Sequence, residues 1–347
     1  MEEVFLDWAE AIHRENPVVD AHLDLAAVVY ERRLAGERDV VRRYFLDSFR
    51  QAHLDVVVSS IYVSPRDLPE AGLRRALGQI CALKEDLESL SGEMEIVTDR
   101  RKLDEALYRG KTAVLLSLEG LDPMGEDLSL LRTFYDLGVR GASLTWSRRN
   151  AFATGSCPAG EDREIPGGLT EAGKKAIGMM EELGMYLDVS HLNKEGFRDV
   201  LKYAKKPFIA SHSNARRLHP TGRNLDDRQI EAIKDRGGVV GLNACSLLTG
   251  VPPSEGEAAL ERLCEHAEYL TACAGPEAAG CGFDLCRELS RAVPRICFET
   301  EDEDVLAHHG EMKKMTAMLL SRGMREETIA GLIGGNFLRY FRRVLPE

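Results

Sequence analysis

The chain has 347 residues, of which 44% are hydrophobic, and its formal net charge is −12 at pH 7. This length and apolar content are sufficient for one large domain or two ordinary ones with a buried core. The acidic charge, with no basic run to offset it, argues against a nucleic-acid-binding protein. No apolar run is long enough to cross a bilayer, and residues 1–16 are typical of an amphipathic helix and not of an export signal. We therefore expect a cytoplasmic protein with no membrane partner.

Short apolar or β-branched runs alternate with longer segments of helical spacing along the whole chain. This alternation predicts a parallel sheet, and eight such runs favour a closed (β/α)8 TIM-like barrel. A doubly wound open sheet is the alternative, which the lack of a GxGxxG after the first run makes weaker. No Pro/Gly/Ser linker divides the chain, so we expect a single domain over residues 1–347. The predicted strands are Val18–Asp20, Leu54–Tyr62, Ala113–Leu118, Gly141–Thr145, Met185–Ser190, Phe208–Ser211, Gly238–Asn243 and Ala278–Asp284.

Acidic and histidine side chains stand at the carboxyl ends of five of these strands. In a barrel those ends meet at one mouth, so residues far apart in the sequence come together there. We expect the metal site at this mouth, because histidines and carboxylates are the ligands of catalytic zinc. The residues are His22 and Asp24 after the first strand, Glu119 after the third, His191 after the fifth, His212 after the sixth and Asp284 after the eighth.

Each of these residues also has an ordinary interpretation when it is taken alone. A single histidine after an apolar run is more often a hydrogen-bonded core residue, and a single glutamate is more often a salt-bridge partner. Three of the nine histidines fall at the same end of three predicted strands, however, which favours a shared site. Five ligand side chains among these six residues exceed what one catalytic zinc uses. Glu119 is the only glutamate at a strand end, so we expect it to bridge two ions.

Four segments of the chain resemble the renal (membrane) dipeptidase family, binuclear zinc peptidases of the amidohydrolase-like barrel group. They are DAHLDL (20–25), LEGLDPMGEDLSLLRTFYDLGVRG (118–141), LDVSH (187–191) and FIASHSNARRLHPTGRNLDD (208–227), and the likeness extends to GGNFLRYF (334–341). The resemblance implies two zinc ions with Glu119 as the bridging ligand. His22 and Asp24 would complete one site, and His191 and His212 the other.

The resemblance also implies roles for two further charged residues. Arg223 matches the arginine of the family that holds the substrate carboxylate, a task that suits the two-pronged guanidinium. The alternative for Arg223 is a surface salt bridge to Asp226 or Asp227. Asp284 corresponds to the first aspartate of the family's Asp-Phe-Asp-Gly segment, although Leu285 and Cys286 replace the next two residues. It would bind the substrate amino group or carry the proton.

Trp146 departs from the family pattern. It stands where renal-type enzymes have a histidine that contacts the oxyanion of the substrate. An indole N–H can donate one hydrogen bond but cannot act as an imidazolium. Asn150 lies nearby and is the candidate substitute donor. This departure bears on rate and substrate range more than on fold or metals.

The family likeness predicts a dipeptidase in which a hydroxide bridging two zinc ions attacks the peptide carbonyl, with Glu119 and Asp284 as the catalytic carboxylates. The substrates would be short free-ended dipeptides, and L-Xaa-D-Xaa dipeptides are among the candidates. Another metallohydrolase, acting on a lactone, phosphoester or cyclic amide, is one alternative, and a catalytically silent metal-binding homologue is another. Family members are often dimers, so a homodimer is also possible.

Overall fold

The computed structural model describes residues 3–157, 161–293 and 303–347. Among these residues, no helix combines the length and the apolar character that a membrane span requires.

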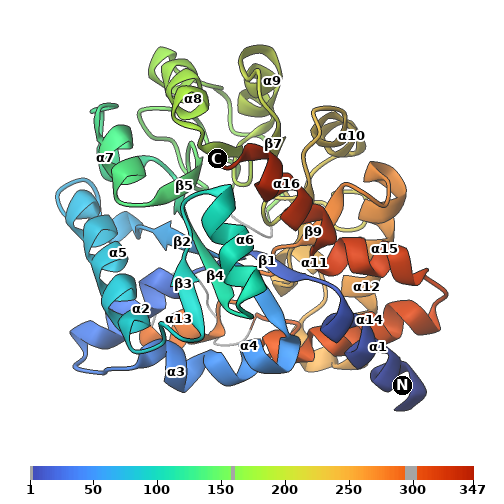
Figure 1. Cartoon of the computed structure of the whole chain (residues 1–347). Coiled ribbons are helices and arrows are strands. Elements are labelled where there is room, and N and C mark those ends of the chain that lie inside the picture. The colour runs from blue at the N-terminus through green and yellow to red at the C-terminus, as the bar shows by residue number, and fades with distance from the viewer. Residues whose placement is uncertain (1–2, 158–160, 294–302) are drawn as a thin grey trace.

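Parallel strands form a curled sheet at the centre of the molecule (Figure 1). Its neighbouring strands follow the order β1, β2, β4, β5, β6, β7, and β3 pairs with the first residues of β4. The strands are β1 (Val18–Leu23), β2 (Leu54–Tyr62), β3 (Met94–Ile96), β4 (Thr112–Glu119), β5 (Val139–Ser143), β6 (Tyr186–Asp188), β7 (Phe208–Ile209), β8 (Val240–Leu242) and β9 (Ala279–Cys281).

Backbone hydrogen bonds close the sheet into a barrel. Strands β8 and β9 pair with each other, and a parallel bridge between Ala210 and Val240 joins β8 to the end of β7. On the other side, the amide of Asp284, beyond β9, donates to the carbonyl of His22 in β1 at 3.1 Å. The expected TIM-like barrel is therefore confirmed.

Helices surround the strands, as Figure 1 shows. They are α1 (Glu3–Glu15), α2 (Leu25–Leu34), α3 (Val40–Tyr44), α4 (Leu46–Ala52), α5 (Gly72–Glu88), α6 (Arg100–Tyr108), α7 (Leu130–Asp136), α8 (Glu171–Leu183), α9 (Lys194–Tyr203), α10 (Asp227–Asp235), α11 (Ser246–Thr249), α12 (Glu257–Ala274), α13 (Arg287–Ala292), α14 (Met312–Ser321), α15 (Glu326–Ala330) and α16 (Asn336–Val344).

All eight predicted strands are present, with boundaries that differ by a few residues. Strand β1 continues to Leu23, so that His22 lies inside the strand and not after it. The short strand β3 was not predicted, because its three residues are too few to show a period of two.

Side-chain alternation along β4 and β2 decides which residues face the barrel interior. Ala113 and Leu115 belong to one buried cluster together with Phe337 and Phe341 of α16, which lies at the amino-terminal end of the barrel. Because alternate residues of a strand share a face, Glu119 points into the same interior at the opposite end. The sequence places an acid on the inner face where β4 ends.

Candidate metal and active site

Three histidines converge on the carboxylate of Glu119 inside the mouth of the barrel. The Nε2 atom of His191 lies 2.8 Å from Oε1 of Glu119, and the Nε2 atoms of His22 and His212 each lie 3.7 Å from it. The two Nε2 atoms of His191 and His212 are 2.9 Å apart. Ser60 on β2 donates to the other oxygen of Glu119 at 3.4 Å. The carboxylate is therefore the centre of the cluster.

Ligand atoms of the expected residues form overlapping groups of three, each with its atoms within 4.8 Å of one another. Glu119, His191 and His212 make one group, and His22, Asp24 and Glu119 make another. All of these side chains are buried. Glu119 belongs to both groups, as a bridging ligand must.

Two buried polar atoms of this cluster have no hydrogen-bond partner among the described residues, namely Nε2 of His22 and Oδ1 of Asp24. Asp24 precedes helix α2, yet its side chain does not cap the helix. An orphaned buried acceptor is costly unless something else binds it. Imidazole nitrogen and carboxylate oxygen are both ligands of divalent cations, so these residues fit a metal ion.

The electrostatics of the cluster point to the same conclusion. Burial lowers the pKa of His22 to about 3, and it lowers the pKa values of His191 and His212 well below their usual range. Burial also raises the pKa values of Asp24 and Glu119, and repulsion between neighbouring carboxylates raises them further. Neutral imidazoles are the form that binds a metal, and a cation would offset the repulsion between the carboxylates.

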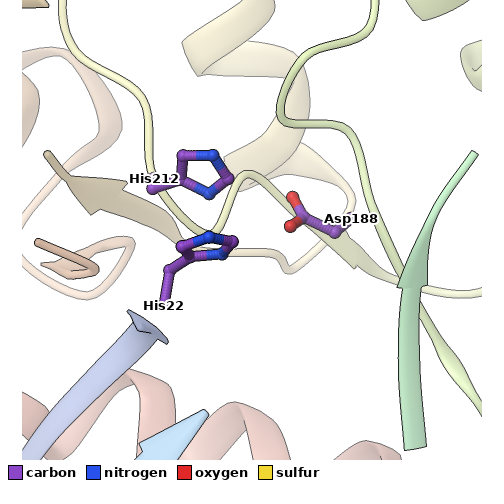
Figure 2. Close-up of side chains that lie close together, drawn as sticks. All are labelled: His22, Asp188 and His212. Carbon is purple, nitrogen blue, oxygen red and sulfur yellow. The ribbon is translucent and has the colours of Figure 1, made fainter. Parts of the chain in front are cut away.

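Asp188, which the sequence interpretation did not include, lies beside two of the histidines (Figure 2). Its Oδ1 accepts from the amides of Ser190 and Ser211, each at 2.9 Å, and its Oδ2 accepts from the Ser211 hydroxyl. The oxygen of that hydroxyl is 2.7 Å from Nδ1 of His212. With its oxygens so engaged, Asp188 orients His212 through Ser211.

Ser147 contacts His191 as Ser211 contacts His212: its hydroxyl oxygen lies 2.9 Å from Nδ1 of the His191 ring. A histidine that offers Nε2 to a cation carries its proton on Nδ1, so this nitrogen donates to the serine. Neither serine is conspicuous in the sequence, since each becomes informative only once the histidine is placed.

Two site residues adopt the left-handed backbone conformation, His191 with φ of 68° and Asp284 with φ of 55°. This conformation is uncommon for residues other than glycine and tends to occur where function requires it. Each residue follows a very short strand, so the sharp turn at the strand end directs its side chain into the mouth.

Arg223 is almost completely buried at the site, so the surface salt bridge to Asp226 or Asp227 is not what the structure contains. Its Nη2 atom donates to the carbonyl of His212 at 3.2 Å and lies 3.3 Å from Nε2 of His191. The guanidinium lines one cavity with the carboxylates of Asp24, Glu119 and Asp284.

Asp284 lies beside the histidine cluster, with Oδ1 3.9 Å from Nε2 of His22. Its Oδ2 accepts a hydrogen bond from Nδ2 of Asn243 at 3.1 Å, and the thiol of Cys286 donates to its carbonyl at 3.1 Å. Burial raises the pKa of Asp284 to about 6, and the nearby charge of Arg223 limits the rise. A carboxyl group with a pKa near neutrality is suited to proton transfer.

Trp146 lines the cavity, which has a volume of about 70 Å³, and its ring centroid is 5.4 Å from that of His191. Asn150, in contrast, is not among the residues that line this cavity. Its amide donates to Asp122 and to the carbonyl of Leu144, and its oxygen accepts from the amides of Phe152 and Ala153. Both N–H groups of Asn150 are therefore engaged, one by Asp122 and one by the carbonyl of Leu144. The role of oxyanion donor remains a prediction for Asn150.

The fold and the donor set define a TIM-like barrel with a candidate metal-binding cluster at its mouth. The family model described as membrane dipeptidase (peptidase family M19) matches residues 6–345, and the chain belongs to this family of metallopeptidases.

Curated relatives agree with this assignment. Dipeptidase 3 of Homo sapiens is 30% identical over 97% of this chain, and Dipeptidase tcpJ of Claviceps purpurea is 27% identical over 90% of it. The chain covers 67% of the length of human Dipeptidase 3 and 72% of the length of Dipeptidase tcpJ. It covers 66% of the length of Dipeptidase 3 of Macaca fascicularis.

Two solved structures resemble the fold closely. One is the dipeptidase AC, a metallopeptidase of family M19, with a TM-score of 0.81 and 24% identity over 96% of this chain and 99% of that one. The other is a metallopeptidase from Rhodobacter sphaeroides bound to a phosphinate mimic of L-Ala-D-Ala, with a TM-score of 0.78 and 24% identity over 95% of this chain and 99% of that one.

Proposed function

We propose that the protein is a zinc-dependent dipeptidase that hydrolyses short peptides with a free amino and a free carboxyl end. The observation that carries this proposal is the cavity itself, in which one buried guanidinium faces three buried carboxylates beside a histidine cluster. Family membership supports the same reaction class, and the ligand of the Rhodobacter sphaeroides structure supports including L-Ala-D-Ala among the substrates to test.

Two zinc ions fit the donor set. His22, Asp24 and Glu119 would hold one, and Glu119, His191 and His212 would hold the other. Ions held in this way polarise a carbonyl oxygen and lower the pKa of water.

The remaining polar groups of the cavity are arranged to hold a dipeptide. Arg223 would bind the substrate carboxylate, since its guanidinium presents two parallel donors. Asp284 would accept a proton and deliver it to the leaving amine, or bind the substrate amino group. The Trp146 ring lies beside the His191 ring at a tilt of 30° and would close the cavity on that side, where it would exclude water.

The experiment that tests this proposal combines metal analysis with a substrate panel. The purified protein is assayed with L-Ala-L-Ala, L-Ala-D-Ala and their N-acetylated and amidated forms, and metal is counted per chain. We expect two zinc ions and cleavage of the free-ended dipeptides alone. Equal cleavage of the blocked forms would contradict the role of Arg223 and favour another metallohydrolase. Two metals with no cleavage would favour a silent homologue, with Trp146 as the first residue to examine.

A further inference from the structure

Three buried asparagines connect the loop that carries Arg223 to the carboxylate of Asp284. They are Asn214 after β7, Asn224 in the Arg223 loop and Asn243 after β8, and at most 2% of each is exposed. Buried amides are costly unless all their polar atoms are bonded, so a chain of them is a rigid element.

The orientation of the Asn243 amide follows from its partners. Its Oδ1 accepts from the backbone amide of Cys245 at 2.6 Å, and a backbone amide can only donate. The Nδ2 atom must then face Asp284, where it donates to Oδ2 at 3.1 Å. Asn243 thus holds one oxygen of the carboxylate from a fixed position at the end of β8.

Asn214 holds the backbone of Asn243 in turn. Its Oδ1 accepts from the amide of Asn243 at 3.0 Å, and its Nδ2 donates to the carbonyl of the same residue at 2.9 Å. The backbone amide of Asn214 donates to Oδ1 of Asn224 at 3.2 Å. Asn224 then donates to the carbonyls of His219 and Leu248, which ties the Arg223 loop to α11.

We propose that Asn214 and Asn243 are positioning residues that fix Asp284 relative to Arg223 and so set the length of peptide that the site accepts. The inference rests on the proposed function, and within it on the role in which Arg223 binds the substrate carboxylate and Asp284 binds the substrate amino group. Because the two groups come from different strand ends, their separation depends on the hydrogen bonds that join those ends. A site of fixed span favours dipeptides over tripeptides.

The test uses Asn243→Ala and the nearly isosteric Asn243→Asp, which keeps the acceptor for Cys245 but replaces the donor to Asp284. Asn336→Ala is the matched control, because Asn336 is also buried and bonds the carbonyls of Pro276 and Ala279 at the far end of the barrel. For each variant, kcat and KM are measured on L-Ala-L-Ala and L-Ala-L-Ala-L-Ala, metal content is determined, and a crystal structure is solved.

We expect both Asn243 variants to lose at least about tenfold in kcat on the dipeptide, since a displacement of roughly 1 Å can cost about a hundredfold. Their KM and metal content stay near those of the unmodified protein, and the ratio of dipeptide to tripeptide turnover falls. Asn214→Ala should lower kcat as well, because it frees the backbone of Asn243, but it should leave KM near that of the unmodified protein, since the backbone amide that bonds Asn224 in the Arg223 loop remains. The control should lower thermal stability without changing kcat or KM.

The crystal structures separate this inference from the proposed function. If the unmodified protein cleaves no dipeptide, the proposed function fails, but the position of the Asp284 carboxylate in Asn243→Ala still tests the positioning role. A carboxylate that stays in place in that variant overturns the inference, and so does an unchanged ratio of dipeptide to tripeptide turnover.

Discussion

Arg223 is a buried guanidinium whose two bonds to the protein go to neutral groups, the carbonyl of His212 and the ring of His191. We expect Arg223→Lys to raise KM for L-Ala-L-Ala by roughly tenfold to a hundredfold, with a smaller change in kcat, because a lysine keeps the charge but loses the paired donors. Steady-state kinetics on L-Ala-L-Ala measure both KM and kcat. The control is Arg216→Lys, which changes an arginine paired with the partly exposed Asp162. A KM that responds equally to both substitutions would count against carboxylate binding by Arg223.

Ser211 and Ser213 offer a comparison between two buried serines of one segment. The Ser211 hydroxyl joins Nδ1 of His212 to Asp188, whereas the Ser213 hydroxyl has no partner among the described residues. We expect Ser211→Ala to weaken metal binding by roughly tenfold to a hundredfold, as is usual when the partner of a ligating histidine is lost. Ser213→Ala should change the affinity for the metal ion little. Competition with a chelator measures both affinities, and equal affinities in the two variants would refute the orienting role of Ser211.

The strand ends of the barrel approach one another closely at glycines. A Cβ atom on Gly241, in β8, would lie 1.8 Å from the carbonyl oxygen of Ser211, whereas one on Gly178, in α8, would meet nothing within 4 Å. We expect Gly241→Ala to lower the free energy of unfolding by about 3 kcal/mol or more, because backbone must move. Gly178→Ala should raise it by roughly 0.5–1 kcal/mol, since alanine favours the helix. Denaturant titration measures both, and a Gly241→Ala protein of normal stability would contradict the packing described for β7 and β8.

The stability of the whole molecule should depend on pH through histidines that lie outside the site. His13 in α1 is buried, with Nδ1 3.1 Å from the carbonyl of Ala52 and Nε2 2.8 Å from the hydroxyl of Thr316. Burial lowers the pKa of His13 to about 4, against 6.5 for its unperturbed value. Between these values the unfolded chain binds more protons than the folded one, so the free energy of unfolding falls as pH is lowered from about 6.5 to about 4.

Each pKa unit corresponds to about 1.4 kcal/mol, so His13 contributes up to about 3 kcal/mol to this fall. We expect His13→Gln, which cannot titrate, to show a shallower loss of stability over the same range. Urea unfolding of both proteins at pH 7.5, 6 and 5 gives the slope of the free energy of unfolding against pH for each of them. The metal-binding histidines are common to both proteins, so they do not affect the difference. Parallel slopes would rule out the buried neutral state of His13.

The sequence by itself determined the barrel and the position of the metal-binding residues. Apolar runs are a local property of the sequence, and Glu119 stands directly at the end of the apolar run that forms β4. His22, His191 and His212 follow similar runs. In a parallel barrel the carboxyl ends of all strands meet, so position along each strand was sufficient to predict a shared site.

Only the tertiary structure decided which polar residues support that site. Asp188 contacts the Ser211 hydroxyl, Asn243 contacts Asp284, and His309 lies 2.7 Å from the carboxylate of Asp20, from which it is separated by 289 positions in the sequence. Hydrogen bonds of this kind depend on side-chain direction and on spacing between strands, which leave no periodic pattern in the sequence. For the same reason the sequence did not show the partners of Asn150, whose amide donates to Asp122 and to the carbonyl of Leu144; its role as a donor to substrate stays a prediction.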